Sequence, residues 1–109
     1  MKIFLDDNRI CPADFQVVRT VEEFEHLVRE NRDDLEVISL DYDLSTAGGG
    51  RTGLNACDFI IKEKINCPRI IIHSNQSNAD KMYAYLSDNL SDTLVEMKEY
   101  NIIEIMKGY

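Results

Sequence analysis

The sequence predicts an α/β protein built around a parallel sheet, and three observations support that prediction. Short apolar runs of strand length alternate with longer segments in which apolar residues recur at helical spacing. The central run, residues 35–40, is almost continuously apolar, as in strands that are buried on both faces. The order of strand and helix then repeats along the chain, which is typical of parallel sheets.

The first half of the chain predicts two strands and one helix before the central strand. Residues 3–6 form the first strand, and residues 15–18 form a short second strand at a sheet edge. Thr20 is a good N-cap, and Glu23 stands three residues later, so the two make a capping box. We expect the helix that starts there to run to about Asn31.

The second half continues the alternation. A helix is expected over residues 54–64, and it starts at Thr52 or Gly53. Residues 69–72 are another buried strand. Asn78 is predicted to cap a third helix.

The C-terminal quarter fits two assignments. Residues 93–97 favour a fifth strand that ends at Lys98, followed by a short helix around residues 102–106. The same apolar spacing also fits one long helix. The strand is the preferred prediction because the alternation before it calls for a strand here.

The bulk properties predict one domain over residues 1–109. The chain has 109 residues with 44% hydrophobic content, enough for a single core. Its formal net charge of -8 argues against a protein that grips long duplex nucleic acid through its phosphates. A small anionic ligand would need a metal ion or local cations to offset the repulsion.

The cysteine count and the apolar runs bear on the compartment. Cys11, Cys57 and Cys67 show no C-x-x-C spacing, which favours reduced thiols. No apolar run approaches the roughly 18 residues that a membrane span needs, and the N-terminus has no signal-peptide pattern. We therefore expect a cytoplasmic protein without a membrane partner.

Polar residues follow three of the predicted strands at the points where the apolar runs stop. They are Asp6 and Asp7, Asp41 and Asp43, and His73, Ser74 and Asn75. Carboxyl ends of parallel strands meet at one edge of the sheet, and ligands bind there. Strand alternation predicts that Asp41 and Asp43 point the same way.

The four aspartates predict a metal site. Carboxylates gathered at one edge repel each other unless a cation lies between them. Oxygen ligands from Asp6, Asp7, Asp41 and Asp43 suit Mg²⁺ or Mn²⁺, either of which would act as a Lewis acid on a phosphate. The alternative is that the aspartates only cap loops after strands, but the gathering of four favours the metal.

His73 is a candidate acid or base, since histidine titrates near neutral pH. Its alternative is a buried histidine that is hydrogen-bonded to the backbone. Ser74, Asn75 and Asn78 are candidate hydrogen-bond donors to a phosphate. For Asn78 the role of helix cap is an alternative that does not exclude phosphate binding.

Three cations are candidates for pairing with a phosphate. They are Arg9, Arg51 and Lys98. Arg51 lies in the glycine-rich stretch of residues 45–53, which is either a plain flexible connection or a loop that a ligand shapes. The alternative for both arginines is an ordinary surface charge.

Three motifs in order resemble the cyclic-phosphate processing receiver family. They are Leu5-Asp6-Asp7-Asn8-Arg9, Ser39-Leu40-Asp41-Tyr42-Asp43-Leu44 and His73-Ser74. Asp6, Asp7, Asp41, Ser74 and Lys98 also resemble the site of two-component receiver domains in their arrangement. The resemblance implies a single-domain, receiver-like (flavodoxin-like) three-layer α/β/α sandwich with a five-stranded parallel sheet. It further implies a site for cyclic phosphates.

Three functional hypotheses follow. The first is metal-dependent hydrolysis of a cyclic phosphate in a small nucleotide or at an RNA 3′ end, with His73, Asp41 and Asp43 as catalytic residues. Such an enzyme would suit RNA repair or antiviral defence signalling. The second is a protein that sequesters a cyclic nucleotide, and the third is a signalling module phosphorylated at Asp41. A homodimer that completes the pocket is compatible with each.

Overall fold

The computed structural model describes residues 1–44, 50–74 and 76–99 and contains one five-stranded sheet. The strands are β1 (Lys2–Leu5), β2 (Gln16–Val18), β3 (Val37–Leu40), β4 (Arg69–Ile72) and β5 (Leu94–Met97). Their order across the sheet is β2-β1-β3-β4-β5, and every neighbouring pair is parallel. The predicted receiver-like fold with five parallel strands is therefore confirmed, and the short second strand lies at an edge as expected.

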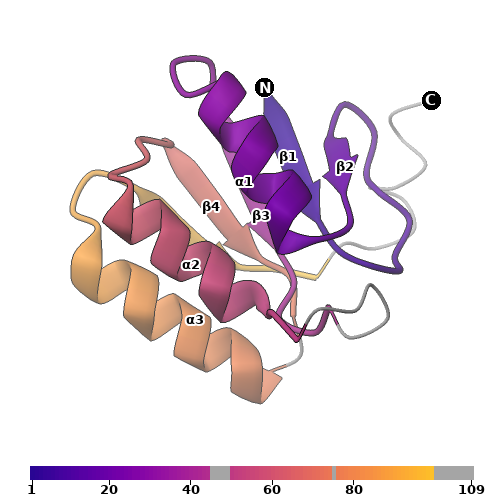
Figure 1. Ribbon diagram of the computed structural model, residues 1–109. Coiled ribbons are helices and arrows are strands. Elements are labelled where there is room, and N and C mark those ends of the chain that lie inside the picture. Colours follow the sequence, from indigo (N-terminus) through magenta and orange to yellow (C-terminus); the bar gives the residue numbers. More distant parts are fainter. Residues whose placement is uncertain (45–49, 75, 100–109) are drawn as a thin grey trace.

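Three helices connect the strands and share one face of the sheet. They are α1 (Val21–Glu30), α2 (Gly53–Lys62) and α3 (Gln76–Asn89). Each helix connects one strand to the following strand of the chain, and all three connections run in the same direction across the sheet. Right-handed crossovers therefore place all three helices on the same side. Figure 1 shows them side by side, with α2 between α1 and α3. None is long and apolar enough to cross a membrane.

The main core fills the space between the sheet and these helices. The strand register places Ile3, Ile38 and Ile70 in one row, and all three are fully buried. Phe24 of α1 and Met82 of α3 are buried against this side. Because side chains alternate along a strand, the residues between these rows face the opposite side of the sheet.

The predicted helix starts are right for two helices and wrong for the third. The Thr20 hydroxyl accepts a hydrogen bond from the backbone of Glu23 at 3.1 Å, and Thr52 caps α2 in the same manner. The third helix begins at Gln76, so Asn78 lies inside its first turn and is not the cap. The preference of asparagine for caps is local and does not fix where a helix begins.

The C-terminal strand is also confirmed, which rules out one long helix over this segment. Backbone hydrogen bonds tie it to the preceding strand, from Leu94 N to Pro68 O at 3.0 Å and from Lys98 N to Ile72 O at 2.9 Å. The predicted final helix around residues 102–106 lies outside the described residues, as do residues 45–49 of the glycine-rich stretch.

Candidate functional site

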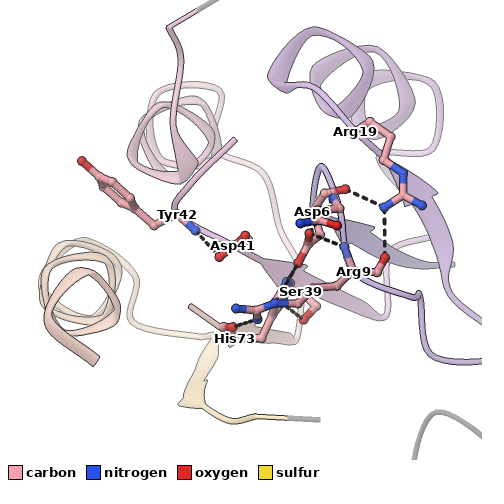
Figure 2. Close-up of polar contacts among 8 residues, drawn as sticks. Asp6, Arg9, Arg19, Ser39, Asp41, Tyr42 and His73 are labelled. Atoms are coloured by element: carbon pink, nitrogen blue, oxygen red, sulfur yellow. Dashed lines mark hydrogen bonds and ion pairs between the residues drawn. The ribbon is translucent and has the colours of Figure 1, made fainter. Parts of the chain in front are cut away.

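Three buried side chains meet where β1, β3 and β4 end. Asp6, Asp41 and His73 are the first residues after these strands, and each offers a ligand atom within 4.8 Å of the other two. Their side-by-side placement follows from the sheet, because Asp41 N donates to Leu5 O at 3.0 Å and His73 N donates to Leu40 O at 2.9 Å. We call these three residues the carboxylate–histidine cluster (Figure 2).

The Asp6 carboxylate accepts hydrogen bonds through both of its oxygens. Its Oδ1 accepts from the backbone N–H groups of Asn8 and Arg9, each at 2.9 Å, and its Oδ2 lies 3.0 Å from His73 Nε2. Burial alone would raise the pKa of Asp6, but the bonds from His73, Arg9 and Asn8 lower it below the ordinary value of 3.8. Asp6 is thus ionised and firmly oriented at neutral pH.

The surroundings of Asp41 disfavour its ionised form more than those of Asp6 do. Its Oδ1 accepts the backbone N–H of Tyr42 at 2.9 Å. Burial and the negative charge of Asp6 raise the pKa of Asp41, and the nearby charges of His73 and Arg9 oppose this only in part. Two buried carboxylates therefore repel each other across the cluster, and a cation between them would relieve that repulsion.

Protein groups hold the His73 ring through both of its nitrogens. Its Nδ1 lies 2.7 Å from Ser39 Oγ, while Nε2 faces Asp6. The ring also stacks on Phe4, with centroids 4.4 Å apart and planes 4° from parallel. Since an ionised Asp6 can only accept, Nε2 must carry the hydrogen of that bond. Ser39, His73 and Asp6 form a hydrogen-bonded chain that runs from β3 through β4 to β1.

Ser39 is a site residue that the sequence hypotheses missed. It is fully buried in the middle of β3. One signal was present, because Ser39 is a hydroxyl inside an otherwise apolar strand and stands two residues before Asp41. Alternation then places it on the face from which Asp41 follows.

Arg9, a predicted phosphate ligand, lies at the rim of the cluster. Its guanidinium donates to the main-chain oxygen of His73, and its Nε lies 3.7 Å from Asp6 Oδ2. Arg19 holds the loop beneath it by donating to Asp6 O at 2.9 Å and to Arg9 O at 3.0 Å (Figure 2). Arg9 is half exposed, so its side chain remains reachable from solvent.

Two of the four predicted metal ligands stand apart from the cluster. Among the described residues, the group of close ligand atoms includes neither Asp7, which is half-buried, nor Asp43, which is exposed. The central strand ends at Leu40, so strand alternation no longer governs Asp41 and Asp43. The difference in their burial follows from that early end.

The other predicted phosphate ligands fall into two groups. Ser74 directly follows His73, and Lys98 follows β5 on the neighbouring strand, so both lie at the same sheet edge. Arg51 is held away by α1, since its Nη2 lies 2.7 Å from Glu25 Oε2 and its Nη1 lies 3.3 Å from a Glu22 oxygen. Two further candidates are Asn78, half-buried in the first turn of α3, and Asn75, which lies outside the described residues.

Gly53 fixes the backbone that carries Asp41. Its N–H donates to Tyr42 O at 2.8 Å, which brings the first residue of α2 against the chain after β3. A Cβ atom at Gly53 would lie 2.1 Å from Asp41 O, closer than any side chain tolerates. The sequence hypotheses treated this glycine as a helix start and as part of the glycine-rich stretch, because a tertiary contact of this kind leaves no local signal.

The cluster suits a hard divalent cation. Its available donors are carboxylate oxygens from Asp6 and Asp41, the ligand type that Mg²⁺ and Mn²⁺ prefer. His73 contacts Asp6 rather than standing alone, which matches the common pattern in which a further hydrogen bond orients a ligating carboxylate. The raised pKa of Asp41 adds an energetic reason for a cation here.

Comparison with protein families gives one match. A family model described as a cyclic-phosphate processing receiver domain matches residues 1–88 and so includes the whole carboxylate–histidine cluster. Searches of curated proteins and of solved structures gave no significant match.

Proposed function

This chain belongs to the cyclic-phosphate processing receiver family, and we propose that it is a metal-dependent enzyme that hydrolyses a cyclic phosphate in a nucleotide or at an RNA 3′ end. Membership supports a role in cyclic-phosphate processing. The finer statement depends on one observation, which is the pairing of two buried carboxylates, Asp6 and Asp41, beside His73.

Asp6 and Asp41 would hold the metal, and Mg²⁺ or Mn²⁺ would supply Lewis-acid stabilisation of the charge that develops on the phosphate. In hydrolysis, a water oxygen bonds to phosphorus, the bond from phosphorus to one ribose oxygen breaks, and the proton that the water gives up is balanced by the one that the ribose oxygen takes. Arg9, at the rim of the cluster, and Ser74, next to His73, would donate hydrogen bonds to the phosphate.

The role of His73 separates into two parts. In the structure it orients Asp6, since both ring nitrogens have protein partners. A role as proton carrier would require the bond between Nε2 and Asp6 to open during the reaction. Asp43, exposed after β3, stays a proposed catalytic residue that would act from the solvent side.

The decisive experiment is incubation with a panel of substrates in Mg²⁺ or Mn²⁺, followed by product analysis. The panel holds 2′,3′-cyclic and 3′,5′-cyclic mononucleotides, cyclic dinucleotides and RNA that ends in a 2′,3′-cyclic phosphate. We expect one class to be hydrolysed, and we expect chelator to stop the reaction. Turnover that persists in chelator would contradict the metal mechanism.

Matched variants sharpen the experiment. Asp6→Asn and Asp41→Asn should each abolish turnover, because each removes a carboxylate of the cluster. Asp34→Asn removes an exposed carboxylate next to the N-terminal amine, far from the carboxyl ends of the strands, and should leave turnover unchanged. Loss of activity in all three variants would point to a general effect of charge instead.

A second candidate function is phosphorylation of Asp41. The arrangement that favours it is Asp41, Ser74 and Lys98 at the carboxyl ends of three adjacent strands, as in receiver domains. Incubation with a small phosphodonor and mass spectrometry would detect a phosphoryl group on Asp41. Phosphorylation without turnover of any cyclic phosphate would support signalling over hydrolysis, and retention of a nucleotide without either result would support sequestration.

A further inference from the structure

A pocket of about 260 Å³ opens at the same edge of the sheet as the carboxylate–histidine cluster. It lies between the ends of β4 and β5 and the first turns of α3. Its lining residues are Ile72, Ser74, Ala79, Asp80, Met97, Lys98 and Glu99. Ile72 and Ser74 flank His73 in the sequence, so the pocket and the cluster share one stretch of chain.

Three of the lining residues, Ile72, Ala79 and Met97, are apolar. Ile72 and Ala79 are buried, and Met97 belongs to β5 yet leaves 49% of its surface exposed. A methionine thioether adapts its shape to a partner and makes favourable contacts with aromatic rings. A flat, partly apolar ring is therefore a suitable partner for these apolar side chains.

The lining offers both hydrogen-bond donors and carboxylates. Ser74 directly follows His73, Lys98 directly follows β5, and both offer donors to an anion. Asp80 and Glu99 offer carboxylates, which repel phosphate but accept hydrogen bonds from hydroxyl or amino groups. An occupant should therefore place its phosphate at Ser74 and Lys98 and a neutral group with several donors at Asp80 and Glu99.

We infer that this pocket binds the nucleoside part of the substrate, a step that rests on the proposed function and names its substrate class. A ribonucleoside has both required features, an aromatic base and donors on the ribose or base. The pocket volume lies just below the range of about 300–1,000 Å³ for typical ligand pockets, which favours a small occupant such as a single nucleoside. A cyclic dinucleotide would also bring a second phosphate against Asp80 and Glu99.

A first test uses the methionine methyl groups as reporters and needs no turnover. With ¹³C-methyl methionine in the full chain, nucleoside 5′-monophosphate in Mg²⁺ should shift the Met97 signal. It should leave the signal of Met82, which is buried beneath Gly53, in place. Inorganic phosphate is the matched probe without a nucleoside and should not move Met97. An unmoved Met97 at millimolar nucleotide would overturn the inference.

A second test separates the nucleoside from the phosphate in kinetics. Met97→Ala should raise the KM for a 2′,3′-cyclic mononucleotide about tenfold, the scale expected for loss of one apolar contact in a pocket. It should leave the KM for glycerol cyclic phosphate, which has no base, nearly unchanged. Leu94→Ala removes another exposed apolar side chain of β5, outside the pocket, and should change neither KM.

The outcomes separate this inference from the proposed function. A shifted Met97 signal without turnover would leave the pocket in place and remove the enzyme. Turnover with equal KM changes for both substrates in Met97→Ala would keep the enzyme and overturn the pocket. The cyclic phosphate can belong to a free mononucleotide or to an RNA 3′ end, so RNA with the same terminal nucleotide is tested as well. A lower KM for the RNA than for the free mononucleotide would identify an RNA end as the substrate.

Discussion

His73 Nε2 lies 3.0 Å from Asp6 Oδ2, and both side chains are almost completely buried. The contact is notable for its path, because β1 and β4 are not neighbours and β3 lies between them. The His73 ring reaches across the end of β3, above Ser39, to meet a carboxylate two strands away. The Arg9 side chain, which follows β1, in turn donates a hydrogen bond to the main-chain oxygen of His73 after β4. The ends of β1, β3 and β4 are therefore cross-linked by hydrogen bonds.

Asp41→Asn should stabilise the fold in the absence of metal. Burial and the repulsion from Asp6 raise the pKa of Asp41, and the neutral amide removes that charge, so we expect a higher free energy of unfolding. Urea unfolding in chelator measures it. Asp43→Asn, at an exposed position in the same segment, is the control and should change stability little. A less stable Asp41→Asn would mean that the carboxylate is favourably held.

The stability gain of Asp41→Asn should depend on pH. A folded pKa above the unfolded value means that the folded protein binds the proton of Asp41 first as the pH falls. The wild type is thus stabilised relative to the variant as pH falls through the raised pKa, and the change is complete below the ordinary value of 3.8. Unfolding free energies of both proteins across this range in chelator should converge in acid. A difference that grows in acid would reverse the assigned sign.

Ser39→Ala should weaken metal binding without unfolding the protein. Losing the hydroxyl frees the His73 ring to reorient, and Asp6 then loses a fixed partner; changes of this kind reduce metal affinity or activity about 10- to 100-fold. Calorimetric titration with Mn²⁺ measures the affinity, and histidine ¹⁵N shifts report the ring nitrogens. Val37→Ala, two residues earlier on the same face of β3, controls for lost packing. Equal Mn²⁺ affinity in the wild type and Ser39→Ala would exclude this role.

Gly53→Ala should damage both the fold and the site. The new Cβ would overlap Asp41 O, so the start of α2 must move, at a cost of about 3 kcal/mol, the upper end for overpacking. Gly50→Ala is the comparison, because Gly50 has a φ of +69° but open space around it, and it should cost only about 1 kcal/mol. Thermal unfolding ranks the two. If Gly50→Ala were the more harmful, the close approach of α2 to Asp41 would not matter.

The sequence predicted what depends on local pattern. The strands, the cap at Thr20, a helix start at Thr52 or Gly53 and the meeting of Asp6, Asp41 and His73 all follow from local sequence patterns and from the geometry of parallel sheets. The positions of Asp41 and Asp43 were harder to predict, because the direction of the chain after β3 depends on the packing of α2 and not on strand propensity.

Contacts between segments that are far apart in the sequence could not be predicted from local sequence patterns. Nothing near Arg51 in the sequence indicates that it pairs with Glu22 and Glu25, which lie 29 and 26 residues earlier in the chain. The same holds for the hydrogen bonds of Arg19 to the chain after β1. Each joins segments whose proximity exists only once the sheet has formed.

The contacts of Arg51 have a consequence for engineering and for evolution. Leu44 is buried before residues 45–50, and Arg51 is fixed to α1 directly after them, so both attachment points are set by the fold. Loop-closure entropy rises slowly with length, by about 0.6 kcal/mol per doubling. Residues can thus be added to or exchanged between these two attachment points while Asp41 and α2 stay in register, so the length of this connection can change without changing the carboxylate–histidine cluster.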